Sequence, residues 1–174
     1  MIRIEQISIT DLHTDAIVNA ANERLRAGGG VCGAIFQSAG YCMLQEACDQ
    51  IGHCDTGSAV ITPAFHLKSR YIIHAVGPVW RDGLHGEPEQ LYGAYSKSLE
   101  LAAENGCKSI GFPLISSGIF GYPVEAAWRQ AILACRDYLD RHTDAPVEIV
   151  FAVLNERIIQ IGNQTIRELA PEFV

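Results

Sequence analysis

Two loops of this chain have the composition that binding of phosphate by the backbone requires. The first loop contains Asn19-Ala-Ala-Asn22, followed by Gly28-Gly29-Gly30-Val31-Cys32-Gly33. The second loop runs from Pro113 to Pro123 and contains Ser116-Ser117-Gly118. Glycine has no Cβ, so its backbone N–H can come close to phosphate oxygens at the N-terminus of a helix. Two such loops that face each other would hold a diphosphate.

The glycines of the first loop also match the spacing of a dinucleotide-binding loop, but their context does not. Gly28, Gly30 and Gly33 match G-x-G-x-x-G, which directly follows a strand and is paired with an acidic residue at the end of the next strand. Here Gly28 comes nine positions after Asn19, and the region of Cys48-Asp49 is expected to be helical. A P-loop is excluded because no Gly-Lys-Ser/Thr follows the glycines. A turn without a ligand is the remaining alternative, although three consecutive glycines carry a cost in conformational entropy.

The composition indicates a folded, acidic protein. The chain has 174 residues, 48% of them hydrophobic, and we expect a single domain over residues 1–174. This hydrophobic fraction excludes an intrinsically disordered chain. Thirteen Lys and Arg against twenty Asp and Glu give a net charge of −7, which disfavours a nucleic-acid partner because a polyanion is repelled. A single phosphate-bearing ligand is compatible with this charge because backbone N–H groups bind anions without a formal charge.

We expect neither a membrane segment nor a metal site. The apolar run from Ile149 to Leu154 is far shorter than the ~20 residues that span a bilayer, and the N-terminal residues lack the pattern of a signal peptide. A cytoplasmic protein with reduced cysteines is therefore expected. Cys42, Cys48 and Cys54 are spaced by six residues, whereas zinc sites prefer C-x-x-C pairs, so the six cysteines are interpreted as small buried thiols.

The hydrophobic pattern alternates between strands and helices. Apolar and β-branched runs predict the strands, and apolar residues at helical spacing predict the helices. Apolar strands that alternate with amphipathic helices imply an α/β sandwich whose sheet is covered on both faces. In such folds, ligands bind where strands end and helices begin. The predicted strands cover residues 3–9, 16–18, 58–62, 71–76, 109–115 and 147–154, and the predicted helices cover 33–50, 91–105, 124–141 and 158–169.

Four segments together resemble the signature of the macrodomain family. They are Asp15-Ala-Ile-Val-Asn-Ala-Ala-Asn22, Gly28-Gly-Gly-Val-Cys-Gly-Ala-Ile35, Ile73-His-Ala-Val-Gly-Pro78 and Pro113-Leu-Ile-Ser-Ser-Gly-Ile-Phe-Gly-Tyr-Pro123. The resemblance covers essentially the whole chain and implies a three-layer α-β-α sandwich with a mixed central sheet. It also implies that ADP-ribose binds in a cleft at the strand ends. The chain most resembles MacroD-type members, which remove mono-ADP-ribose from acidic side chains and deacetylate O-acetyl-ADP-ribose, with no metal or cofactor.

The resemblance implies a role for each matching residue. Asn22 would orient the proximal ribose, which carries the ester, and an amide suits this task because it both donates and accepts hydrogen bonds. The alternative for Asn22 is a residue that only caps its loop. Phe120 would pack on the same ribose, whereas His74, in the middle of a strand, is interpreted as a buried structural histidine. The first phosphate loop would comprise Gly29, Gly30, Val31 and Gly33, and the second Ser116, Ser117, Gly118, Ile119 and Phe120. Ala21 is a further ligand-binding candidate.

Two departures from the family pattern concern the adenine. The family commonly has Gly-Asp-Ile-Thr where this chain has Ile7-Ser8-Ile9-Thr10. Ser8 accepts a hydrogen bond without the charge of an aspartate, so the adenine contact of Ser8 and Ile9 is expected to be weaker. Leu154 takes the place of an aromatic residue, which preserves burial but removes stacking. Asn155 follows and is a further candidate for ligand contact.

The third departure concerns catalysis, because Cys32 stands where MacroD-type enzymes carry an aspartate. A thiol is a poor substitute for a carboxylate as a general base. Either a phosphate of the ligand activates the attacking water, or Cys32 acts as a thiolate favoured by the helix N-terminus, or Cys32 is inert. The leading hypothesis is a monomeric hydrolase of ADP-ribosyl esters in which Asn22 and Cys32 lie at the reaction centre. The alternative is a non-catalytic ADP-ribose reader.

Overall fold

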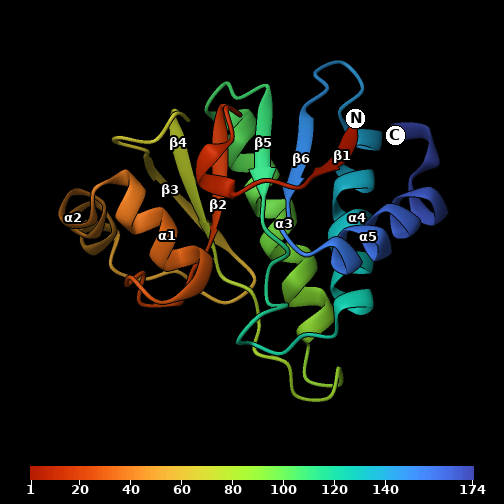
Figure 1. Cartoon of the computed structure of the whole chain (residues 1–174), viewed down its shortest axis with the longest axis horizontal. Helices are drawn as coiled ribbons and strands as arrows, with labels where there is room; N and C mark the ends of the chain where they lie inside the picture. The colour runs from red at the N-terminus through yellow and green to blue at the C-terminus, as the bar shows by residue number, and fades with distance from the viewer.

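The centre of the fold is a six-stranded mixed sheet, and the computed structural model describes residues 1–174 (Figure 1). The strand order is β1-β6-β5-β2-β4-β3. Neighbouring strands are parallel except β3 and β4, which are antiparallel. The strands are β1 (Ile2–Glu5), β2 (Ala16–Ala20), β3 (Ala59–Pro63), β4 (Tyr71–Ala75), β5 (Ser109–Phe112) and β6 (Glu148–Ala152).

Helices cover both faces of this sheet (Figure 1). One hydrophobic core contains residues of α1 and α2, and the other contains residues of α3, α4 and α5. Successive residues of β6 enter opposite cores, because side chains alternate along a strand: Ile149 and Phe151 face one, Val150 the other. The predicted three-layer α/β sandwich is therefore confirmed. The helices are α1 (Gly30–Ala39), α2 (Tyr41–Ile51), α3 (Glu87–Glu104), α4 (Val124–Arg141) and α5 (Glu156–Leu169).

A cluster of aromatic side chains joins the helices to the two strands that support the second loop. The ring of Phe151 on β6 lies 5.0 Å from that of Trp128 on α4 and 5.5 Å from that of Phe112 on β5. The ring of Tyr95 on α3 lies 5.0 Å from that of Phe112. All four side chains are fully buried, and offset or tilted aromatic pairs stabilise beyond the area that they bury. The end of β5, from which the second loop starts, is thus rigidly anchored.

Two predicted elements differ from the structure. The helix predicted over residues 33–50 is two helices, because Gly40 has φ of +111° and interrupts the chain between α1 and α2. Only glycine adopts such a conformation without strain. The strand predicted over residues 3–9 ends at Glu5, and Ile9 instead begins a short 3-10 helix, η1 (Ile9–Asp11). The remaining predicted elements exist, with ends that shift by a few residues.

The start of α3 depends on Glu87, which sequence reasoning missed. Its side chain is buried, and its carboxylate accepts hydrogen bonds from the backbone N–H groups of Arg81, Asp82, Gly83 and His85. Burial alone would raise the pKa of Glu87, but these donors outweigh it and lower the pKa to about 2. An anionic Glu87 therefore folds the segment from residue 81 to 85 around itself.

The structure also tests the expectations that the cysteines are buried thiols and that no segment crosses a membrane. All six cysteines are free thiols. Five are buried, but Cys42 is exposed, so the interpretation of every cysteine as a buried thiol was wrong at that position. None of the helices combines the length and the apolar character needed to cross a bilayer.

Candidate functional site

A cavity of about 490 Å³ opens at the carboxyl ends of β2, β5 and β6. Both loops singled out in the sequence line it, so the structure brings them together as two walls of one site. Apolar residues from the end of β6 to the start of α5 form a further part of its wall: Ala152, Val153 and Ile158. The predicted site residues on its walls are Ala21, Asn22, Gly29, Gly30, Val31, Cys32, Ser116, Ser117, Gly118, Ile119 and Phe120.

The first loop presents bare backbone to this cavity. Gly29 is the N-cap of α1 and has no side chain to cap the first-turn N–H groups. These N–H groups lack partners within the helix and carry the positive end of its dipole. A Cβ placed on Gly28 or Gly29 would meet no atom within 4 Å. The space above the loop is therefore open to a ligand, and an anion is the ligand that its donors suit.

Gly33 has a different role from the other glycines of the loop. It does not line the cavity, and a Cβ at this position would lie 2.6 Å from the carbonyl oxygen of Gly28. Gly33 thus allows the loop to fold back against the first turn of its own helix. Its predicted contact with a ligand remains a prediction, while its contact with Gly28 explains why glycine stands there.

The second loop is held by side chains. The hydroxyl of buried Tyr95 accepts a hydrogen bond from the N–H of Ile115 at 2.8 Å and donates to the carbonyl oxygen of Pro113 at 3.2 Å. Burial raises the pKa of Tyr95, so the hydroxyl stays protonated. Ser116 has φ of +67°, is buried, and its Oγ has no hydrogen-bond partner. A strained serine of this kind costs about 1–3 kcal/mol, and such strain is typical of ligand-binding loops.

Asn22 caps its own turn and also lies on the cavity wall. Its Nδ2 donates to the carbonyl oxygen of Arg26 at 2.8 Å, and its Oδ1 accepts from the N–H of Arg26 at 3.1 Å. Asn22 therefore does cap its loop, and its predicted contact with the ribose remains a prediction. An amide carries two N–H bonds and two lone pairs, so one donor and one acceptor of Asn22 remain for a ligand. Capping fixes the orientation in which Asn22 would present them.

Cys32 lies next to Asn22 and contacts the same carbonyl group. Its Sγ lies 3.8 Å from the carbonyl oxygen of Arg26, toward which the thiol S–H donates. The side chain is also almost completely buried. Cys32 therefore packs in the cavity wall, with its thiol directed at a backbone carbonyl group.

His74 lies on β4, beside Asn19 of β2, and is buried, as the sequence predicted. Its Nδ1 lies 3.1 Å from Nδ2 of Asn19, and its Nε2 lies 3.0 Å from Oγ1 of Thr62. Burial lowers the pKa of His74 to about 4, so the ring is neutral at pH 7. It does not line the cavity. His74 thus supports the strand that leads into the first loop and takes no part in the site itself.

Comparison with known proteins decides the family. A family model described as "Macro domain" matches residues 18–131. This chain belongs to the macro domain family. The O-acetyl-ADP-ribose deacetylase of Escherichia fergusonii is 46% identical over 175 residues, 98% of this chain and 98% of that protein. A macro domain-containing protein of Xanthomonas axonopodis pv. citri is 47% identical over 95% of this chain and 94% of its own.

Solved macrodomain structures share the whole fold. The Oceanobacillus iheyensis macrodomain with ADP superimposes with a TM-score of 0.90, at 35% identity, over 97% of this chain and 91% of that chain. The Trypanosoma brucei macrodomain in complex with ADP-ribose superimposes with a TM-score of 0.87, at 39% identity, over 95% of this chain and 68% of that one. The predicted family is therefore confirmed.

Four predicted ligand-binding residues lie off the cavity wall of this macrodomain. Ser8 exchanges a hydrogen bond with Thr10 through their hydroxyls, 2.9 Å apart, and Ile9 packs in the core beside α1. Leu154 is 65% exposed. Asn155 is the N-cap of α5, where its Oδ1 accepts from the N–H of Ile158. Their contacts with the ligand remain predictions, and Val153 and Ile158 lie on the wall instead.

A second cavity of about 290 Å³ adjoins the first and was not foreseen. The two cavities share Asn22, Gly77 and Phe120. Gly77 lies just beyond β4, within the Ala-Val-Gly-Pro segment on which the family resemblance rests. Its position at the end of a strand could have marked Gly77 as a residue of the site. A Cβ on Gly77 would overlap the side chain of Ser116. The other residues of the second cavity are Glu23, Arg24, Thr56, Val76 and Val79.

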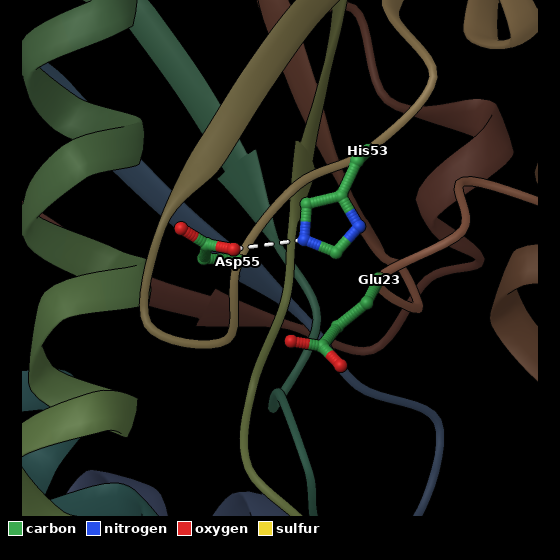
Figure 2. A group of neighbouring side chains, drawn as sticks. All are labelled: Glu23, His53 and Asp55. Carbon is green, nitrogen blue, oxygen red and sulfur yellow. Dashed lines mark hydrogen bonds and ion pairs between the residues drawn. The ribbon is translucent and has the colours of Figure 1, made fainter.

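A group of three exposed side chains lies beside the second cavity of the macrodomain (Figure 2). One ligand atom each of Glu23, His53 and Asp55 lies within 4.8 Å of the others. His53 Nε2 lies 2.8 Å from Oδ1 of Asp55, and Glu23 Oε2 accepts from the N–H of Thr56 at 3.2 Å. An imidazole and two carboxylates are donors that divalent metals accept. Hydrogen bonds within the chain already explain the group, and we assign no ion to it.

Proposed function

We propose that this macrodomain binds ADP-ribose in the larger cavity and hydrolyses ADP-ribosyl esters. The substrates would be O-acetyl-ADP-ribose and proteins mono-ADP-ribosylated on aspartate or glutamate. One observation carries the proposal: a bare helix N-terminus and a strained serine–glycine loop form two walls of one cavity. Relatives named O-acetyl-ADP-ribose deacetylase, at 46% identity over nearly the whole chain, support it.

The diphosphate would lie between the two loops. The N–H groups at the start of α1 and those of Gly118 and Ile119 would donate to its oxygens, whereas the N–H of Ser117 already donates to the carbonyl oxygen of Leu114. A net charge of −7 does not oppose this binding, because the donors are backbone dipoles aimed at the ligand at short range. Adenine would extend toward the apolar surface of Val153 and Ile158, and the proximal ribose would lie beside Asn22 and Phe120.

The reaction would use a water activated by the ligand. With O-acetyl-ADP-ribose, the water oxygen would bond to the acetyl carbonyl carbon, and the bond between that carbon and the ribose oxygen would break. With an aspartate or glutamate ester, the water oxygen would bond to C1″ as the bond between C1″ and the carboxylate oxygen breaks. Either reaction gives a carboxylate, a ribose hydroxyl and a proton. Asn22 orients the ribose through its free donor and acceptor. Cys32, as a thiol that donates to Arg26, supplies no general base, so a phosphate oxygen of the ligand takes the proton of the water. Orientation within the cavity then provides most of the acceleration.

The first experiment measures release of free ADP-ribose from a protein mono-ADP-ribosylated on glutamate. We expect release by the wild type and a loss of at least about 100-fold in Asn22→Ala, because a misplaced ribose loses its near-attack geometry. Asn163→Ala is the matched control, since Asn163 is exposed on α5 and far in sequence from both loops. Equal turnover by Asn22→Ala and the wild type would overturn the assignment of Asn22.

A second candidate function is favoured by the contact of Cys32. Position 32 holds a thiol that donates to the Arg26 carbonyl group, so no carboxylate is present there to act as a general base. A non-catalytic ADP-ribose reader would lack this carboxylate as well. Calorimetry with ADP-ribose separates the two functions. Binding without release identifies a reader, and Cys32→Asp would then restore turnover. Cys32→Asp should change the rate of a hydrolase that relies on phosphate-activated water by less than about tenfold.

A further inference from the structure

We propose that the second cavity is a carboxylate subsite in which Arg24 binds the carboxyl group attached to, and then released from, the proximal ribose. Its placement rests on the proposed function, which puts that ribose beside Asn22 and Phe120. Both residues border the second cavity as well as the first. A group esterified to the ribose would therefore lie where the two cavities meet, and Arg24 is on the wall of the second.

The size of the second cavity exceeds what an acetyl group needs. Its volume is about 290 Å³, whereas one water molecule takes ~30 Å³ in the liquid. An acetyl group has three heavy atoms, so it would fill only part of this space. The remainder accommodates the side chain of a modified aspartate or glutamate and its hydration. The same subsite thus serves both substrates of the proposed reaction.

The local backbone holds Arg24 in place. Leu25 has φ of +56°, and its side chain is buried in the core beside α1. Its N–H donates to the carbonyl oxygen of Asn22 at 3.0 Å, and both ends of the Asn22 side chain bind Arg26. The segment from Asn22 to Arg26 is therefore a turn that is closed by hydrogen bonds and anchored by the buried side chain of Leu25. Arg24 lies in this turn, two residues after the amide that would hold the ribose, and it lines the second cavity.

Arg24 is the only cation on the walls of the second cavity, and it has no partner. It takes part in none of the ion pairs of the structure and in none of its side-chain hydrogen bonds. The carboxylate of Glu23, by contrast, accepts from the N–H of Thr56 and faces His53 and Asp55 (Figure 2). The negative charges of Glu23 and Asp55 repel an anion, which directs a carboxylate away from them and toward Arg24.

The chemistry of the proposed reaction supplies this anion. Hydrolysis converts a neutral ester and water into a carboxylate, a proton and a ribose hydroxyl, so negative charge develops on the acyl oxygens as the ester is cleaved. A guanidinium group matches a carboxylate with two parallel N–H···O bonds. Arg24 therefore stabilises the negative charge that develops on the acyl oxygens more than it stabilises the neutral ester, which is the condition for an effect on rate.

The test compares Arg24→Gln with Arg129→Gln, which removes the same charge from an exposed position on α4. With O-acetyl-ADP-ribose, we expect Arg24→Gln to lower kcat/KM about tenfold, a modest effect because the guanidinium is exposed to water. Its Kd for ADP-ribose, which carries no carboxylate, should stay within about twofold of the wild type. Arg129→Gln should match the wild type in both measurements. An unchanged kcat/KM in Arg24→Gln would overturn the proposal.

A second measurement does not depend on turnover. Acetate is titrated into ¹⁵N-labelled protein saturated with ADP-ribose, and the amide signals of the residues around the second cavity are followed. We expect saturable shifts in the wild type and in Arg129→Gln, and none in Arg24→Gln. The same shifts in all three proteins would overturn the subsite. If the wild type hydrolyses no ester, the proposed function fails while this titration still decides whether Arg24 binds a carboxylate.

Discussion

The two loops that wall the larger cavity present backbone N–H groups in opposite ways. The first loop presents a segment without side chains, Gly28 to Gly30, and it depends on the close contact of Gly33 with Gly28. The second carries side chains at most positions and is pinned by the hydroxyl of Tyr95, with strain stored at Ser116. Backbone N–H groups can thus be made accessible to a ligand in two ways. The first loop leaves out Cβ atoms, and the second is hydrogen-bonded to a buried side chain.

The difference extends to the cores beneath the loops. The strand that leads into the first loop packs on the titratable His74, whereas the second loop rests on Tyr95 and on aromatic rings that do not titrate near neutral pH. The first loop should therefore be sensitive to acid and to added volume, and the second to the loss of one hydroxyl. Three experiments examine this contrast.

The largest expected effect is that of acid on the support of the first loop. The pKa of folded His74 is about 4, against 6.5 for the unfolded residue. Between these values, the unfolded chain binds a proton that the folded chain does not, so the free energy of unfolding falls as pH drops from 6.5 to 4. The loss is up to about 3 kcal/mol for this one group. Urea unfolding at several pH values measures it.

The control for the acid experiment is the slope of stability against pH. His74→Gln should have a smaller slope than the wild type between pH 6.5 and 4, whatever its stability at pH 7. His13→Gln, at an exposed position, should keep the wild-type slope. Equal slopes in the wild type and His74→Gln would show that His74 does not titrate in this window.

A smaller effect is expected from added volume in the first loop. Gly33→Ala places a methyl group 2.6 Å from the Gly28 carbonyl oxygen, and overpacking of this kind costs roughly 1–3 kcal/mol. We expect a lower midpoint of thermal unfolding and weaker binding of ADP-ribose. Gly29→Ala is the matched variant, because its methyl group meets no atom within 4 Å. It should leave stability unchanged and weaken only the binding, and equal destabilisation by both variants would contradict the role of Gly33.

The smallest expected effect is the loss of one hydroxyl under the second loop. Tyr95→Phe leaves the buried N–H of Ile115 without its acceptor, which costs about 1–2 kcal/mol of stability. The second loop should then move more freely, and ADP-ribose should bind less tightly. Tyr92→Phe, which removes a hydroxyl that donates to Asp137 outside the loops, is the comparison for hydroxyl loss alone. Unaltered affinity for ADP-ribose in Tyr95→Phe would show that the hydrogen bonds of the Tyr95 hydroxyl do not determine the binding conformation of the second loop.

Much of the fold followed from local pattern, and the errors have local causes. The helix over residues 124–141 was predicted with the observed bounds, because its apolar residues recur at strict helical spacing. The helix over residues 33–50 was predicted as one, because periodicity continues through Gly40 and does not reveal its backbone angle. Ile7 and Ile9 alternate as in a strand, yet pairing of β1 with β6 ends at Glu5, and pairing is a property of the sheet.

The candidate site was predicted in part. The two glycine-rich loops were identified from composition, and the family assignment from the order of four segments. The sequence does not show that Cys32 and Asn22 share the carbonyl oxygen of Arg26, because hydrogen bonds across a turn depend on its geometry. Nor does it show that Leu154 is exposed to solvent while Val153 lines the cavity, since β6 ends at Ala152 and the alternation of a strand does not fix the residues beyond it.

The sequence by itself determined the family, the alternation of strands and helices, and the two segments able to present backbone to an anion. These depend on residue types and short spacings, which act within a few residues of the chain. Only the tertiary structure decided which atoms face the cavity, that a second cavity lies beyond Asn22, and that Arg24 stands on its wall without a partner. Such facts arise where segments distant in sequence meet, because burial and the pairing of charges are set by the packing of the whole chain.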